Sequence, residues 1–139
     1  MSETSLHGGC LCGAVTYTVD PPFQRMVHCH CSRCRKGTGT GHATNLIVDQ
    51  QQFRWLGGET LIARFDLESA KSFGKWFCGR CGSPLPRLRR NGTVMVIPAG
   101  SLDDTPPLQP SDRIFWSSRA EWSCGAGGLP VHDEYPPTW

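Results

Sequence analysis

The 139-residue chain contains eight cysteines, and seven of them fall in three short clusters that constrain its fold more than any other feature. The clusters are Cys10-Leu11-Cys12, Cys29-His30-Cys31-Ser32-Arg33-Cys34 and Cys78-Gly79-Arg80-Cys81. Cysteines separated by one or two residues do not bridge each other without strain. The first residues lack the charged start and apolar stretch of a secretory signal, so we expect a cytoplasmic protein. In that reducing compartment clustered cysteines bind metal more often than they form disulfides.

The spacing inside each cluster allows two sulfurs to reach the same ion. In a strand, residues i and i+2 point to one face, so Cys10 and Cys12 can share a metal. The run Cys78-Gly79-Arg80-Cys81 is typical of a knuckle, in which a two-residue spacer brings both sulfurs to one ion. Thiolate sets of this kind select zinc or iron–sulfur over hard cations. We therefore expect two Zn²⁺ ions per chain, one structural and one catalytic.

Seven thiolates fit one closed site and one open site. Structural zinc is normally four-coordinate, whereas catalytic zinc has three protein ligands and a vacant position. The spacing leaves two partitions open. In the first, a ribbon-type site takes Cys31, Cys34, Cys78 and Cys81, and the remainder is Cys10, Cys12 and Cys29. In the second, Cys10, Cys12, Cys78 and Cys81 close one site, and the open one takes Cys29, Cys31 and Cys34. The second is favoured because its open set lies within six residues.

The rest of the sequence predicts a small, mostly β domain. No window of about 12 residues holds a sustained helical period, and 16 glycines and 11 prolines indicate short strands joined by many turns. Strands are expected at residues 14–19, 25–31, 44–48, 53–56, 60–65, 72–77, 94–97 and 113–116. Residues 32–36 are expected to form one helical turn, capped by Ser32. We expect a zinc-binding domain at 1–124, a Gly/Pro-rich tail at 125–139, and no transmembrane helix.

Three motifs of the chain, taken together, resemble those of a known family. They are GCLCGAV at 9–15, CHCSRCR at 29–35 and FCGRCGSPL at 77–85, followed by PAGSLDD at 98–104 and IF at 114–115. The combination is similar to the glutathione-dependent formaldehyde-activating enzyme family, which includes the domain of centromere protein V. The resemblance implies an all-β, tent-like fold. It also implies structural zinc at Cys10, Cys12, Cys78 and Cys81, and catalytic zinc at Cys29, Cys31 and Cys34.

The same resemblance implies carbon–sulfur lyase chemistry, in which formaldehyde and a small thiol such as glutathione join reversibly as S-hydroxymethylglutathione. A zinc ion with three thiolates is a weak Lewis acid, but it can hold an incoming thiol as thiolate, because coordination deprotonates a group with an ordinary pKa of about 8.5. Arg33, Arg35 and Lys36 adjoin Cys34 and are candidates to bind the carboxylates of the thiol. Alternatively, these three side chains are ordinary solvated charges on the surface.

For other residues near the clusters, the sequence supports only less specific predictions. In a strand, His28 and His30 face away from the neighbouring sulfurs, which predicts a supporting or surface role, and His42 is expected to line the site. The pair Asp103-Asp104 indicates a turn. Cys124 is expected to be an unligated thiol or, alternatively, to supply the fourth sulfur of the open site. The aromatic residues expected mostly in the core are those at 53, 55, 65, 76, 77, 115, 116 and 122.

Two other functions compete with the enzyme. A non-enzymatic zinc module that binds a protein partner would have closed four-ligand sites or a large exposed apolar patch. Nucleic-acid binding would use Arg87, Arg89 and Arg90. Seven thiolates and two Zn²⁺ change the formal net charge from +2 to −1, and this disfavours nucleic-acid binding.

Overall fold

The computed structural model describes residues 4–90, 92–123 and 127–138. In these residues the chain forms eleven short strands, one α-helix and five 3₁₀ turns. The strands are β1 (Leu6–Gly9), β2 (Thr16–Val19), β3 (Met26–Cys29), β4 (Ala43–Asp49), β5 (Phe53–Gly57), β6 (Ile62–Asp66), β7 (Gly74–Cys78), β8 (Pro84–Leu85), β9 (Arg87–Leu88), β10 (Val94–Pro98) and β11 (Asp112–Ile114). The helical elements are α1 (Ser32–Thr38), η1 (Gln50–Gln52), η2 (Glu59–Leu61), η3 (Ala99–Ser101), η4 (Trp116–Ser118) and η5 (Glu121–Ser123). The predicted mostly β class is confirmed.

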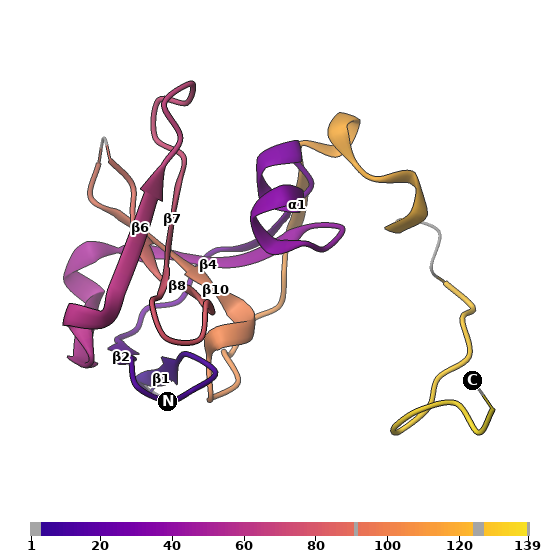
Figure 1. Cartoon of the computed structure of the whole chain (residues 1–139), viewed down its shortest axis with the longest axis horizontal. Helices are drawn as coiled ribbons and strands as arrows, with labels where there is room; N and C mark the ends of the chain where they lie inside the picture. Colours follow the sequence, from indigo (N-terminus) through magenta and orange to yellow (C-terminus); the bar gives the residue numbers. More distant parts are fainter. Residues whose placement is uncertain (1–3, 91, 124–126, 139) are drawn as a thin grey trace.

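The strands form three small sheets. Their orders are β1-β2-β5, β11-β3-β4-β10-β9 and β6-β7-β8. Neighbouring strands are antiparallel except β11, which runs parallel to β3. In Figure 1, β6 and β7 form a long hairpin beside the sheet of β4 and β10, and α1 lies near the beginning of β4.

The main core lies between the first and second sheets. Tyr17 of β2, Leu46 of β4 and Ile97 of β10 are fully buried in it. Tyr17 also packs against Phe53, with ring centroids 5.3 Å apart, and its hydroxyl lies 2.6 Å from Ser101 Oγ. Burial of this apolar set, worth about 1.5–3 kcal/mol for each large side chain, holds the two sheets face to face.

One glycine is required by this packing. A Cβ at Gly8 would clash with the ring of Tyr17 and lie 2.6 Å from the carbonyl oxygen of Ser101. Position 8 therefore accepts only a residue without a side chain, which explains why β1 contains glycine in spite of its poor strand propensity.

Most expected strands exist with boundaries shifted by a few residues. The prediction missed β1, β8 and β9. The helix extends to Thr38, and its N-cap is Cys31, whose Sγ accepts a 3.2 Å hydrogen bond from the N–H of Cys34. The prediction of Ser32 as the cap was therefore wrong by one residue. The last strand ends at Ile114, because Phe115 has a positive φ of 54° and turns the chain into η4.

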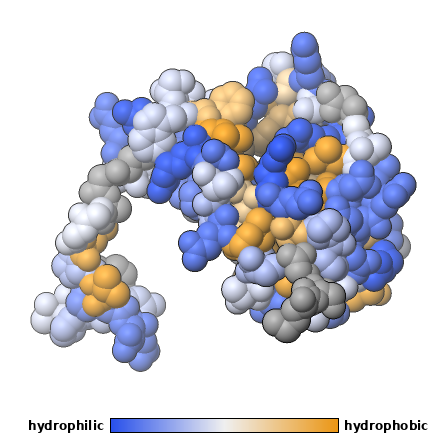
Figure 2. All heavy atoms as spheres, turned by 180° about the vertical axis from the view of Figure 1, so that it is seen from behind, coloured by the Kyte–Doolittle hydropathy of each residue, from blue (hydrophilic) through white to orange (hydrophobic). Residues whose placement is uncertain are grey.

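The chain after β11 leaves the sheets. Figure 1 shows this segment running past α1 and away from the body. Several large apolar side chains are exposed, and Figure 2 shows apolar atoms on the far part of the segment. Trp122 is 73% exposed, and Phe65, Phe115 and Trp116 are also exposed, so the prediction of these four as core residues was wrong. Phe65 lies on the edge strand β6, and the other three follow the last strand, where no second layer covers them.

The predicted boundary at residues 124/125, and the predicted roles of Cys124, fall outside the described residues. Residues 127–138 form neither strand nor helix. No helix in the described ranges is both long and apolar enough to cross a membrane.

Candidate metal centres and adjoining cleft

Four cysteines from two distant loops meet at one point, and we call them the four-cysteine cluster: Cys10, Cys12, Cys78 and Cys81. Cys10 and Cys12 follow β1, and Cys78 ends β7 just before the turn that holds Cys81. All four sulfurs lie within 4.8 Å of one another. Cys12 Sγ is 3.6 Å from Cys10 Sγ and 3.8 Å from Cys78 Sγ. Tetrahedral zinc with Zn–S bonds of about 2.3 Å places its sulfurs about 3.8 Å apart, so this donor set fits zinc.

Hydrogen bonds from neighbouring groups orient three of the sulfurs in this cluster. The backbone N–H of Val15 donates to Cys10 Sγ at 3.3 Å, and that of Arg80 donates to Cys78 Sγ at 3.4 Å. Ser83 Oγ lies 3.2 Å from Cys81 Sγ, and hydrogen bonding by Ser83 lowers the pKa of Cys81 to about 5. Donors aimed at ligand sulfurs orient them and stabilise their charge.

The three-cysteine cluster, Cys29, Cys31 and Cys34, is built by the junction of β3 and α1. Cys29 ends the strand, Cys31 caps the helix, and Cys34 lies in the first turn of the helix. Their sulfurs also lie within 4.8 Å of one another. A hydrogen bond with Cys34 lowers the pKa of Cys29 to about 6. Among the described residues no fourth sulfur joins them, and three convergent sulfurs fit a zinc ion that keeps one position for an outside ligand.

The structure groups the sulfurs as in the favoured partition. The ribbon-type alternative, which joins Cys31 and Cys34 to Cys78 and Cys81, is not the observed grouping. Within the described ranges no histidine or carboxylate completes either cluster.

His30 lies between Cys29 and Cys31 in the sequence and is part of the packing next to the three-cysteine cluster. Its side chain is fully buried, so a surface role is wrong for this residue. Arg113 Nη1 lies 3.2 Å from His30 Nε2, and because arginine only donates, Nε2 accepts and the proton of a neutral ring is on Nδ1. The rings of Trp116 and His42 pack on it at centroid distances of 5.1 and 5.0 Å. Burial lowers the pKa of His30, which favours the neutral ring that this geometry requires.

His28 lies on the same side of β3. Its Nδ1 is 2.7 Å from Thr44 Oγ1 on the adjacent strand, and its ring is 4.2 Å from that of His42. His28 and His30 therefore pack against His42, His28 also contacts β4 through Thr44, and neither ring reaches the sulfurs on the other face.

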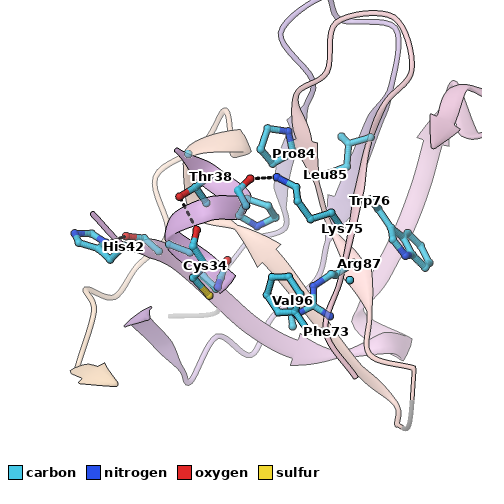
Figure 3. A pocket seen from close by; sticks show the side chains of 17 residues that line it. Cys34, Thr38, His42, Phe73, Lys75, Trp76, Pro84, Leu85, Arg87 and Val96 are labelled. Atoms are coloured by element: carbon cyan, nitrogen blue, oxygen red, sulfur yellow. Dashed lines mark hydrogen bonds between the residues drawn. The ribbon is translucent and has the colours of Figure 1, made fainter. Parts of the chain in front are cut away.

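Two hollows adjoin Cys34 and share part of their lining, so we describe them as two lobes of one cleft. Figure 3 shows the first of these lobes. The shared residues are Cys34, Asn45, Phe73, Arg87 and Val96. We call the first, of about 300 Å³, the apolar lobe; it is also lined by Ala43, Leu85, Pro84, Pro98 and His42. We call the second, of about 770 Å³, the basic lobe; it is also lined by Arg33, Lys71, Arg89, Ser32, Ser69 and Ser72. Neither lining contains a carboxylate.

Arg87 stands at the junction of the lobes. Figure 3 shows it beside Phe73, and its guanidinium carbon lies 5.1 Å from the centroid of that ring. Its Nη1 donates a 3.2 Å hydrogen bond to the carbonyl of Ser72. Burial lowers the pKa of Arg87, but a guanidinium remains charged, so the junction carries a half-buried positive charge.

Lys75 holds the helix that bears Cys34. Its Nζ donates to the carbonyl of Gly37 in α1, so β7 is tied to the helix (Figure 3). Burial lowers the pKa of Lys75. One N–H of the ammonium is therefore engaged with the backbone, and Lys75 also lines the apolar lobe.

The predicted carboxylate contacts are only partly in the cleft. Arg33 lines the basic lobe, whereas Arg35 and Lys36 line neither lobe. His42 lines the apolar lobe, as expected from the sequence. The arginines proposed for nucleic acid are divided: Arg90 donates to the carbonyls of Leu67, Ala70 and Phe73, where it holds a loop, while Arg87 and Arg89 line the cleft.

Asn45 was missed in the sequence. It lies in the middle of β4 and lines both lobes, and its side chain makes no hydrogen bond to the described residues. The signal was available in the alternation of this strand, since Leu46 and Val48 face the core and position 45 faces the other way. A polar side chain there indicates a function on that face.

Comparison with known proteins identifies the same family that the cysteine motifs resemble. The family model described as "Glutathione-dependent formaldehyde-activating enzyme" matches residues 5–118. A Halomonas elongata protein, named "Putative glutathione-dependent formaldehyde-activating enzyme", is 36% identical over 126 residues, which cover 84% of this chain and 78% of that protein. The crystal structure of a Rhodobacter sphaeroides protein matches with a TM-score of 0.61 at 24% identity, over 77% of this chain and 98% of the other, and this likeness supports the fold alone.

Proposed function

Because the chain belongs to the glutathione-dependent formaldehyde-activating enzyme family, we propose that it is a zinc-dependent carbon–sulfur lyase-type enzyme that acts on glutathione or a similar small thiol. Its product would be the S-hydroxymethyl adduct of the thiol with formaldehyde. The observation that carries the proposal is the position of the three-cysteine cluster, whose Cys34 lines a cleft with several cations and no carboxylate.

The two clusters have different roles in this proposal. Cys10, Cys12, Cys78 and Cys81 hold a structural zinc, because four sulfurs saturate a tetrahedral ion. Cys29, Cys31 and Cys34 hold the catalytic zinc. There the ion supplies a vacant position at which an incoming thiol is kept as its thiolate at neutral pH.

The basic lobe binds the body of the thiol. Glutathione carries two carboxylates, and Arg33, Lys71 and Arg89 offer them charge-assisted hydrogen bonds. Binding at these points places the sulfur of the thiol near Cys34 and restricts its approach to the aldehyde. Such positioning converts a bimolecular encounter into a reaction within one complex.

Asn45 is the polar group best placed to act on the aldehyde. In the reaction the sulfur forms a bond to the carbonyl carbon, and the π pair of the C=O bond moves to the oxygen, which then takes a proton. The side-chain N–H of Asn45, exposed to both lobes, donates to that oxygen as its negative charge develops. In the reverse direction the same contact loosens as the aldehyde leaves.

The experiment that tests this function measures exchange between ¹³C-formaldehyde and its glutathione adduct by NMR. The uncatalysed exchange is the reference, and the zinc-loaded protein is expected to accelerate it. Isothermal titration with glutathione provides an independent readout of binding. A zinc-loaded protein that neither binds glutathione nor changes the exchange rate overturns the proposal.

One observation supports the second candidate function, a non-enzymatic zinc module that binds a protein partner. The segment after β11 exposes Trp122, Leu129, Val131 and Tyr135, and such side chains are typical of a surface that binds a protein. This supports the non-enzymatic zinc module. The cleft beside an open cluster favours the enzyme, because a purely structural module has no use for an incomplete ligand set.

A further inference from the structure

The two lobes of the cleft differ in chemistry, and this difference bears on the second reactant. We infer that the carbonyl partner of this chain is an aldehyde with an apolar body of several carbons, and that the apolar lobe binds this body while the basic lobe binds an anionic thiol. The inference rests on the proposed function and extends it from formaldehyde to a class of larger aldehydes.

The apolar lobe is too large for a one-carbon reactant. Its volume is about 300 Å³, and a water molecule in the liquid takes about 30 Å³, so the lobe has room for about ten molecules of that size. Formaldehyde has two heavy atoms and needs no pocket for a side chain. A volume of this kind is at the lower end of the range found for small-molecule sites, about 300–1,000 Å³.

The apolar lobe is also poorly suited to the two carboxylate groups of a glutathione-like thiol. Leu85 and Val96 are buried and Pro84 and Pro98 lie beside them, so its walls are mainly apolar. Of its two cations, Lys75 is engaged with the carbonyl of Gly37. Arg87 is at the boundary with the other lobe, where it binds the carbonyl of Ser72. Both cations are thus partly engaged with backbone carbonyls, and a carboxylate in this lobe would have fewer cationic partners than in the basic lobe while losing its hydration against apolar walls.

The basic lobe, in contrast, meets the needs of the whole thiol. Arg33, Lys71 and Arg89 line it together with four serines. Both carboxylates of a glutathione-like thiol therefore have partners on the same side of Cys34. The apolar lobe, which shares part of its lining with the basic lobe, is then available for the group attached to the carbonyl carbon.

The reaction balances without a further reagent. A thiol R–SH and an aldehyde R′–CHO give R–S–CH(OH)–R′: the S–C bond forms, the C=O π bond breaks, and the proton of the thiol ends on the oxygen. Nothing is oxidised or reduced. The only change from the formaldehyde reaction is that R′ is an apolar group in place of hydrogen.

The test compares three probes by isothermal titration with the zinc-loaded full chain: glutathione, S-methylglutathione and S-hexylglutathione. The two thioethers mimic the carbon–sulfur bond of the adduct and differ only in the length of the apolar group. A buried methylene strengthens binding by about fourfold, so the hexyl probe is expected to bind at least about tenfold more tightly than the methyl probe.

A lobe-filling variant locates the effect. Gly100 lines the apolar lobe, and a Cβ built there meets no atom within 4 Å, so position 100 has room for the start of a side chain and Gly100→Phe adds bulk at the lobe. It is expected to reduce the hexyl-to-methyl affinity ratio towards one. The matched control is Gly127→Phe, which is expected to leave the ratio at the wild-type value, because Gly127 has equally open surroundings but lines neither lobe. Thermal unfolding and zinc content verify that both variants are folded.

The outcomes separate the inference from the function on which it rests. If glutathione binds but the methyl and hexyl probes bind equally, the inference is wrong and the formaldehyde reaction stands. If the hexyl probe binds more tightly in both Gly100→Phe and the wild type, the apolar group lies elsewhere and the assignment of the lobe is wrong. If none of the three probes binds, the proposed function fails, and the inference fails with it.

Discussion

The backbone N–H of Leu11 donates a 2.9 Å hydrogen bond to the hydroxyl of Ser83, a residue 72 positions later in the chain. Ser83 in turn contacts Cys81 Sγ, so one hydroxyl connects the two loops that supply the four-cysteine cluster. The contact holds these loops in register independently of the sulfurs. A site closed from two distant loops needs such a support, since its ligands have no local means of staying together.

Substitution Ser83→Ala is expected to weaken the four-cysteine cluster. The variant loses the hydrogen bond that stabilises the Cys81 thiolate and the one that anchors Leu11, and the free energy of unfolding should fall by about 1–2 kcal/mol. One of two zinc ions should also be released faster to a chelator. Ser117→Ala, at an exposed position, is the control. Equal release rates in the two variants would mean that Ser83 does not support the metal.

The two clusters are expected to respond differently to loss of their sulfurs. The triple variant Cys29→Ser, Cys31→Ser, Cys34→Ser should bind one zinc ion less per chain and remain folded, because these residues are local to the β3–α1 junction. The double variant Cys78→Ser, Cys81→Ser should unfold or fail to accumulate, because its cluster joins the first and third sheets. Metal content by mass spectrometry and circular dichroism check both. An unfolded triple variant with an intact double variant would reverse the assigned roles.

Removal of a cation from the basic lobe should affect binding of the thiol. Arg33→Met is expected to raise the KM for glutathione about tenfold with little change in kcat, because a charge-assisted hydrogen bond to a carboxylate is worth about 1.5–3 kcal/mol. Arg25→Met changes an exposed arginine outside both lobes and is the control. Titration with glutathione gives the affinity directly. If Arg25→Met weakens binding as much as Arg33→Met, the effect is general charge and not a contact.

Loss of the Asn45 amide should affect the chemical step. Asn45→Ala is expected to lower kcat about a hundredfold, the usual effect of removing one donor to a developing oxyanion, and to leave the affinity for glutathione nearly unchanged. Asn45→Gln retains the amide and should recover part of the rate. Exchange kinetics and titration separate the two effects. A fall in affinity equal to the fall in rate would assign Asn45 to binding alone.

The grouping of the sulfurs was the part of the site best predicted from sequence, because sulfur spacing is a local property. Cys29, Cys31 and Cys34 lie within six residues, and strand and helix geometry place their side chains together wherever the rest of the chain goes. The partner of Cys10 and Cys12 was less certain, since loop contacts between residues 12 and 78 depend on the arrangement of whole sheets.

The cleft could not be predicted, because its walls come from segments that meet only in the folded chain. Arg87 was considered for nucleic acid, since its neighbours in sequence are also arginines, and its burial against Phe73 depends on the β7–β8–β9 path. His30 illustrates the same limit. Its direction, away from the sulfurs, follows from alternation along β3, but its burial requires Trp116 and Arg113, which arrive after more than eighty residues.

The difference in chain separation between the two clusters has a consequence for how the protein acquires its metals during synthesis. The ligands of the open cluster are complete once residue 34 has left the ribosome, while those of the closed cluster are incomplete until residue 81. In the roles proposed above, a nascent chain would therefore capture its first ion in the three-cysteine cluster, the proposed catalytic centre. The ion of the four-cysteine cluster, with its proposed structural role, would bind last, when most of the strands have already been synthesised.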